Sequence, residues 1–131
     1  MIHNLNTLYF LIIIFIALEL FESNWQKADR FYGVIKNNYT VYKKSVFLFF
    51  LLNPTFIFSI YLAISLNNYG FLMNMIIILK FVDISFRLNL CKKIDNNEDI
   101  STLIPIDIEY NLVYRYINVL IYPGTFFLSL L

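Results

Sequence analysis

The sequence has few of the residues from which catalytic and metal sites are usually built. It contains one cysteine, Cys91, and one histidine, His3, in 131 residues. A disulfide or a cysteine-rich zinc site needs several thiols, so this chain can form neither by itself. A single histidine likewise excludes multi-histidine metal or haem sites and a histidine-based nucleophile relay. We therefore expect a protein that is not an enzyme, with no catalytic residues, no metal site and no cofactor.

Charge is also scarce, and its two signs are balanced. Charged residues make up 15% of the chain, and ten basic residues against nine acidic ones give a formal net charge of +1. This balance creates no cationic field of the kind that binds nucleic acid, so we expect no nucleic-acid partner. Glycine and proline number three each, which argues against a disordered chain.

Apolar residues are what the sequence has in excess. Hydrophobic residues account for 60% of the chain and aromatic residues for 19%, more than a soluble globular domain carries. The length suggests one domain over residues 1–131, and we expect an all-α integral membrane protein. The bias toward Ile, Phe, Asn, Tyr and Lys is typical of an AT-rich genome. A bacterial inner membrane and an organellar inner membrane fit that bias equally well.

Four apolar stretches predict about four transmembrane helices in a small bundle. They cover residues 7–21, 45–66, 71–90 and 113–131. The stretch 45–66 is the clearest, because its uncharged length matches the roughly 20 residues that cross a bilayer. The first stretch is short and has no positive flank or cleavage signal, so we interpret it as a retained anchor. The last contains Pro123 and Gly124, so a broken or re-entrant helix is an alternative there.

The loop at residues 22–44 has an amphipathic pattern. Its aromatic residues recur at helical spacing while its lysines fall elsewhere, the main aromatic positions being Trp25, Tyr32, Tyr39 and Tyr42. The pattern predicts an interfacial helix lying on the membrane, with its Trp and Tyr side chains in the headgroup zone. A docking surface for a partner protein is the alternative. The segment SNWQ at Ser23–Gln26 fits a capping box and is predicted to start this helix.

Basic residues are distributed unevenly among the loops, which predicts how the chain is threaded. The loop at residues 22–44 carries Lys27, Arg30, Lys36, Lys43 and Lys44, and the loop at residues 91–112 with its flanks carries Arg87, Lys92, Lys93 and Arg115. The N-terminal tail and the turn at residues 67–70 have none. The positive-inside rule therefore places both long loops inside and both termini outside.

The stretch 71–90 carries Lys80, Asp83 and Arg87, spaced i, i+3 and i+7. On a helix these residues share one face, and ionisable groups within a bilayer are costly unless they are paired or face a protein interior. This face therefore indicates where the internal contacts of the bundle lie. We expect Arg87 to pair with Asp83 and to snorkel toward the inner interface.

The threading also predicts a partner for Lys80. It makes the first and third stretches run in the same direction, and at about 1.5 Å of rise per residue Glu19 reaches nearly the same depth as Lys80 and Asp83. We predict an ion pair between Glu19 and Lys80 across a helix contact, and a snorkelling or protonated carboxylate is the equal alternative for Glu19. Glu22 follows one turn later and is interpreted as a solvated helix end.

Asn53 and Pro54 interrupt the clearest stretch in its first half. Proline removes a backbone hydrogen bond, so we expect a kink at this position. Asn53 is then placed to satisfy a freed backbone group or to bond a neighbouring helix. The short turn at residues 67–70 requires the second and third stretches to pack antiparallel.

Two functions of different classes fit these features, with the lipid bilayer as a partner in both. The first is a non-catalytic accessory or assembly subunit that contacts other membrane subunits or itself, and an organelle-encoded respiratory-complex subunit fits the composition equally well. The second is a small proton-coupled transporter or channel in which Glu19 or Asp83 titrates. Four short spans with a carboxylate in the first resemble small multidrug transporters, which implies proton-coupled transport. The long loops, the few glycines and the charged third stretch depart from that family.

Overall fold

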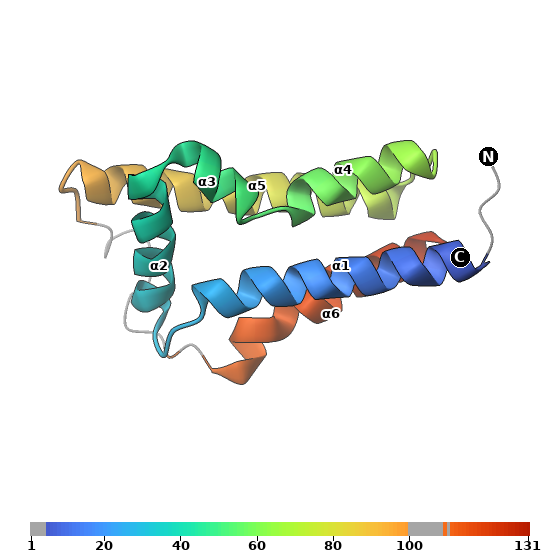
Figure 1. The fold of residues 1–131 in the computed structure, drawn as a ribbon, viewed down its shortest axis with the longest axis horizontal. Coiled ribbons are helices and arrows are strands. Elements are labelled where there is room, and N and C mark those ends of the chain that lie inside the picture. Colours follow the sequence, from blue (N-terminus) through green and yellow to red (C-terminus); the bar gives the residue numbers. More distant parts are fainter. Residues whose placement is uncertain (1–4, 100–108, 110) are drawn as a thin grey trace.

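The structure, a computed structural model, describes residues 5–99, 109 and 111–131. Helices dominate these residues, as the all-α prediction requires (Figure 1). In chain order they are α1 (Leu5–Gln26), α2 (Phe31–Lys44), α3 (Val46–Leu51), α4 (Thr55–Ser65), α5 (Phe71–Asp95) and α6 (Leu112–Ser129). His3 and much of the predicted loop 91–112 lie outside the described residues.

Four helical columns form the body of the molecule. α1 and α6 lie in one layer, and α4 and α5 lie in the other (Figure 1). α1 contacts α4 and α6, and α5 contacts the same two helices, but no Cα atoms of α1 and α5 lie within 8 Å of each other. α1 and α5 therefore face each other across the diagonal of the bundle, and only long side chains can join them.

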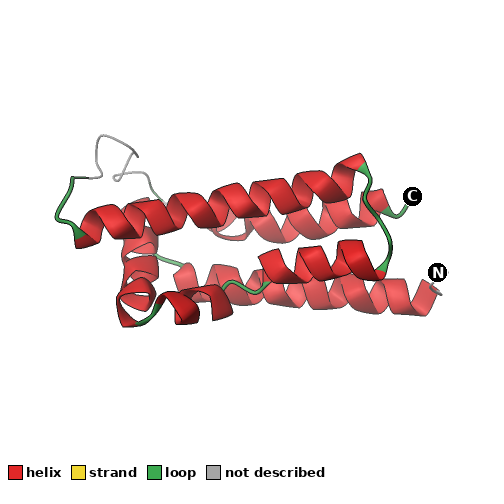
Figure 2. Cartoon of the chain, turned by 90° about the horizontal axis from the view of Figure 1, so that it is seen from above, coloured by secondary structure: helices red, strands yellow, loops and turns green. Residues whose placement is uncertain are grey.

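The connections gather at the two ends of the bundle. α1 begins, α6 ends and the α4–α5 turn lies at one end, which we call the open end (Figures 1 and 2). In that turn Asn67 has a positive φ of 50°, a conformation that asparagine tolerates better than most residues. α2 runs across the columns at the opposite end, which we call the crossed end. Its Ile35 packs against Leu90 of α5, with Phe31 and Ile94 beside them.

The amphipathic helix is therefore present, but its predicted start is wrong. Ser23–Gln26 forms the last turn of α1, and α2 begins only at Phe31. α1 continues beyond the predicted boundary at residue 21. The additional turn includes Trp25, whose indole N–H donates to the backbone oxygen of Leu52. Trp25 consequently does not share a helix with Tyr32.

The stretch 45–66 is divided into two helices rather than forming one continuous span. α3 ends at Leu51 and α4 begins at Thr55, with Asn53 and Pro54 between them. Proline has no N–H to donate, and its ring clashes with the preceding turn, so the helix stops there. By contrast, α6 continues through Pro123 and Gly124 without a break, and α5 extends past residue 90 to Asp95.

One helix of the described residues, α1, is both long and apolar enough to cross a membrane by itself. α5 is longer, but Lys80, Asp83 and Arg87 interrupt its apolar residues. α3 and α4 have 6 and 11 residues, fewer than the roughly 20 that span a bilayer.

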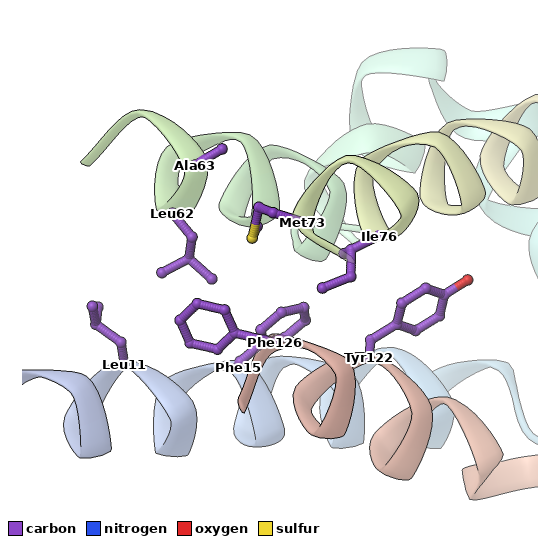
Figure 3. Packing of buried hydrophobic residues seen from close by; sticks show 8 residues of the cluster. All are labelled: Leu11, Phe15, Leu62, Ala63, Met73, Ile76, Tyr122 and Phe126. Atoms are coloured by element: carbon purple, nitrogen blue, oxygen red, sulfur yellow. The ribbon is translucent and has the colours of Figure 1, made fainter. Parts of the chain in front are cut away.

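Apolar side chains fill the bundle between its middle and the open end. Four helices contribute to this apolar cluster, which consists of Leu11, Phe15, Leu62, Ala63, Met73, Ile76, Tyr122 and Phe126 (Figure 3). Phe15 is at its centre, with ring centroids 5.7 Å from Phe58 in an edge-on contact and 5.9 Å from Phe126. The other half of the bundle, toward the crossed end, contains most of the buried polar side chains in addition to the smaller apolar cluster of Ile35 and Leu90.

Candidate functional site: a buried charge network

Two matching rows of polar residues face each other across the diagonal of the bundle. The row on α1 is Glu19, Glu22 and Gln26, and the row on α5 is Lys80, Asp83 and Arg87. Both rows have the spacing i, i+3, i+7, and α1 and α5 run in the same direction (Figure 1). A constant offset of 61 residues therefore joins Glu19 to Lys80 and Gln26 to Arg87.

Lys80 lies between α1 and α6 and is almost fully buried. Its Nζ donates to Oε1 of Glu19 and lies 3.8 Å from Oε2 of Glu22. The same atom lies 3.9 Å from the ring centroid of Tyr122, within the range of a cation–π contact. The structure thus places together the two residues whose pairing the sequence predicts. Their side chains meet across the diagonal rather than at a direct helix contact.

Glu22 binds the start of α4 and is not the solvated helix end expected from the sequence. Its side chain is buried, Oε1 accepts a hydrogen bond from the Thr55 backbone N–H at 2.9 Å, and Oε2 accepts one from Thr55 Oγ1 at 2.7 Å. The N-cap residue of α4 is Pro54, whose side chain cannot accept a hydrogen bond. A carboxylate from α1 therefore satisfies the free N–H and complements the positive end of the helix dipole.

Arg87 connects four segments of the chain through its guanidinium group. Nη1 donates to the side-chain oxygens of Gln26 at 2.9 Å, Asn38 at 3.1 Å and Asn53 at 2.8 Å, and Nη2 donates to Asp83 at 2.9 Å. These partners lie on α1, on α2, at the α3–α4 break and on α5. The expectation that Arg87 snorkels to the interface is wrong, because acceptors inside the bundle bind it and leave it 8% exposed.

The α3–α4 break is held by side chains on both sides. Asn53 is 1% exposed, and its Nδ2 donates to the backbone oxygen of Phe49 at 2.8 Å while its Oδ1 binds Arg87. The indole Nε1 of Trp25 donates to the backbone oxygen of Leu52 at 2.7 Å. Carbonyl groups of the last turn of α3 and of the break thus find donors in the Asn53 side chain and in Trp25 of α1.

The remaining residues predicted for interfacial docking lie on α2. Tyr32 is exposed, and Lys36 Nζ lies 5.1 Å from its ring centroid. Tyr39 stacks on Tyr42 and donates its hydroxyl to Asp95 of α5 at 3.1 Å, a bond that raises the pKa of the Tyr39 phenol.

Cys91 lies near the crossed end of α5 and is fully buried. The thiol is therefore shielded from solvent.

A cavity of about 90 Å³ opens beside the network near the crossed end. Its walls include Glu19, Gln26, Asp83 and Arg87 together with Ser23 and Asn118. Glu19 and Arg87 of this wall each have a buried side-chain atom, Glu19 Oε2 and Arg87 Nε, with no hydrogen-bond partner among the described residues. Among residues 5–99, 109 and 111–131, no three His, Cys, Asp or Glu side chains are grouped so as to hold a metal ion.

Sequence reasoning missed part of this network. Glu22, Gln26, Asn38 and Thr55 all bind its charged members, yet none was singled out as a site residue. The repeated i, i+3, i+7 spacing of polar residues on α1 and α5 was a signal that could have revealed Glu22 and Gln26. Asn38 and Thr55 had no comparable signal, because only the folded chain brings them near.

No protein-family model, curated protein or solved structure matches this chain.

Proposed function

We propose that the chain is a multi-pass membrane protein that serves as a non-catalytic accessory or assembly subunit of a larger membrane complex. The supporting observation is an inverted distribution of side chains. Glu19 and Lys80 are 1% and 3% exposed, whereas Phe47, Phe71 and Leu120 are more than 70% exposed. Water would oppose both features, because buried charges lose their hydration and exposed apolar groups order the solvent.

A bilayer removes the conflict on the outer surface. Large apolar side chains are exposed on α1, α4, α5 and α6, and such a surface exceeds the apolar patches of monomeric soluble proteins. Lipid tails or the apolar faces of other subunits are suitable partners for it. In this arrangement α1, the α3–α4 pair, α5 and α6 are the four spans.

The charge distribution supports one orientation in the membrane. All eight basic residues outside the charge network lie on α2, on the segments beside it, or on the ends of α5 and α6 nearest the crossed end. By the positive-inside rule, the crossed end then faces inside and the open end outside. α2, which runs across the columns (Figure 1), takes the place of an interfacial helix.

The charge network favours a structural role over transport. Glu19, Glu22, Lys80 and Arg87 each bind groups from other helices or segments, so the network joins α1, α2, α4 and α5. A subunit that stabilises a complex needs a defined shape and exposed surfaces for its neighbours. Both are present here. A transporter needs a path through the bundle, and the apolar cluster fills the bundle toward the open end.

Extraction in mild detergent tests the proposal. The chain should be in the membrane fraction and should co-migrate with larger, different subunits in native electrophoresis. The exposed-face variant Leu120→Ser should weaken that association, and the matched substitution Leu62→Ala in the buried cluster should act on stability instead. A free monomer in the absence of other subunits, or recovery without detergent, would contradict the proposal.

Proton-coupled transport is the second candidate, and one observation favours it. Glu19 carries a free carboxylate oxygen beside a cavity. After reconstitution, this candidate requires proton flux that Glu19→Gln abolishes. Flux that persists in Glu19→Gln, or no flux from the wild type, would remove it.

A further inference from the structure

The two unpartnered atoms of the cavity define what can occupy it. Glu19 Oε2 can accept hydrogen bonds, and Arg87 Nε can only donate one. Both are buried, and each loses free energy if it remains unpaired, typically about 1–3 kcal/mol and more for a charged group. A suitable occupant must donate to the carboxylate and accept from the guanidinium. Water does both.

The cavity also has the size and the walls that water requires. A volume of about 90 Å³ accommodates roughly three water molecules at about 30 Å³ each. Ser23 and Asn118 add a hydroxyl and an amide to its walls, so several molecules would each find polar partners. An apolar cavity of this size would remain empty, but this one has charged and polar groups on α1, α5 and α6.

Glu19 shares its cation with a second carboxylate. Lys80 Nζ binds Glu19 and lies 3.8 Å from Oε2 of Glu22, and the α6 group in contact with it is the neutral Tyr122. Arg87 and Arg115 also line the cavity, where Arg87 pairs with the partly exposed Asp83 and Arg115 with the exposed Asp29. Two buried carboxylates beside one cation repel each other, and a proton bound by one of them would remove that repulsion.

The free carboxylate oxygen identifies where that proton would bind. Both oxygens of Glu22 already accept hydrogen bonds from Thr55, and Oε1 of Glu19 accepts one from Lys80. Oε2 of Glu19 is the remaining oxygen, and Glu19 forms part of the cavity wall.

We propose that the cavity holds a cluster of water molecules through which Glu19 binds a proton from the crossed end of the bundle. In this step a hydronium ion of the cluster gives a proton to Oε2, so that a carboxylate and a hydronium ion become a carboxylic acid and water. Ser23, Gln26 and Arg115 place the cavity near the crossed end. Phe15 and Phe126 fill the bundle on the other side, so the proton site opens to one side only.

Infrared difference spectroscopy of the full chain in detergent or in lipid tests this site. The wild type should show the C=O band of a protonated carboxylic acid near neutral pH, and the band should shift when the solvent is changed to D₂O. Glu19→Gln should remove the band. Glu98→Gln makes the same substitution at an exposed glutamate and should leave it unchanged.

Three outcomes would overturn the proposal: no carboxylic acid band in the wild type, a band that survives Glu19→Gln, or a band that does not shift in D₂O. The first and third are measured on the wild type, so they remain decisive if the variant fails to fold.

The sidedness of the cavity rests on the proposed membrane location and has its own measurement. In sealed vesicles, Ser23→Cys should react with a membrane-impermeant thiol reagent only from the side of the crossed end, and the wild type, whose Cys91 is buried, is the control. Reaction from the opposite side would overturn the one-sided site. If the chain does not associate with the vesicles at all, the membrane location fails, while the infrared result still decides the proton site.

Discussion

The two halves of the bundle are held together by different forces. Toward the open end, the apolar cluster around Phe15 packs rings and aliphatic side chains from four helices. Toward the crossed end, Glu22, Lys80 and Arg87 form hydrogen bonds and ion pairs between the same columns and α2. Within a bilayer, apolar packing has little hydrophobic driving force, because lipid tails are as apolar as the side chains. In the proposed membrane location, the polar half is therefore the part that specifies which helix faces which.

The two halves also differ in how strictly their contacts fix the positions of the helices. Apolar contacts are non-directional, and an apolar core tolerates exchange of its side chains as long as volume is conserved. A buried ion pair tolerates neither sliding nor rotation of a helix, because a displaced partner leaves a charge uncompensated. The matched offset of 61 residues at two points along α1 and α5 consequently defines the register of the bundle. The following substitutions test this contrast.

The largest loss of stability is expected for Lys80→Met, in the polar half. It leaves Glu22 without its cation and Glu19 without its hydrogen-bond donor, and removing one partner of a buried pair typically costs about 3–5 kcal/mol. Equilibrium unfolding in mixed detergent micelles, followed by circular dichroism, measures the change. The double variant Glu19→Gln, Lys80→Met should recover much of the loss. If the double variant is as unstable as the sum of the two single variants, the pair does not couple α1 to α5.

Phe15→Ala removes the central ring of the apolar half and should have the next largest effect. Such a substitution costs about 3–5 kcal/mol in the core of a soluble protein, from lost transfer energy and from the cavity. In lipid the transfer contribution falls away, so we expect a loss of about 2–3 kcal/mol in the same unfolding experiment. A loss greater than that of Lys80→Met would reverse the proposed contrast between the two halves.

Thr55→Val tests a single hydrogen bond of the polar half. The valine side chain has nearly the same shape but cannot donate to Oε2 of Glu22, while the backbone N–H of residue 55 still donates to Oε1. Hydrogen bonds to charged groups are worth about 1.5–3 kcal/mol, and we expect the lower end, about 1.5 kcal/mol. Ser59→Ala, on the same helix, is the matched control, since the Ser59 hydroxyl donates only to its own helix at Phe56.

The smallest effect is expected at the outer surface. Leu120 is 79% exposed, so Leu120→Ala in detergent should change the free energy of unfolding by less than about 0.5 kcal/mol. A markedly larger loss in the purified monomer would show that this face packs within the chain and is unavailable to lipid or to another subunit.

Several features could be predicted from the sequence because they depend on local patterns. The helical character, the amphipathic helix that ends at Lys44 and the place of the interruption at Pro54 follow from side-chain periodicity and from the chemistry of proline, although a kink was expected and a break is present. The contact between Glu19 and Lys80 could be predicted from their positions along the two helices. The predicted threading makes both helices run in one direction, and an equal rise per residue then brings the two side chains to nearly the same level.

Other features depend on contacts between distant segments, so only the tertiary structure decided them. Packing against the bundle extended α1 to Gln26, which turned an expected helix start into a helix end. The diagonal placement of α1 and α5 buried Arg87, because acceptors from α1, α2 and the α3–α4 break surround it. Glu22 acquired its role only when the start of α4 came within hydrogen-bond distance. Periodicity determines which face of a helix is polar, but the partner of that face depends on how all the helices pack together.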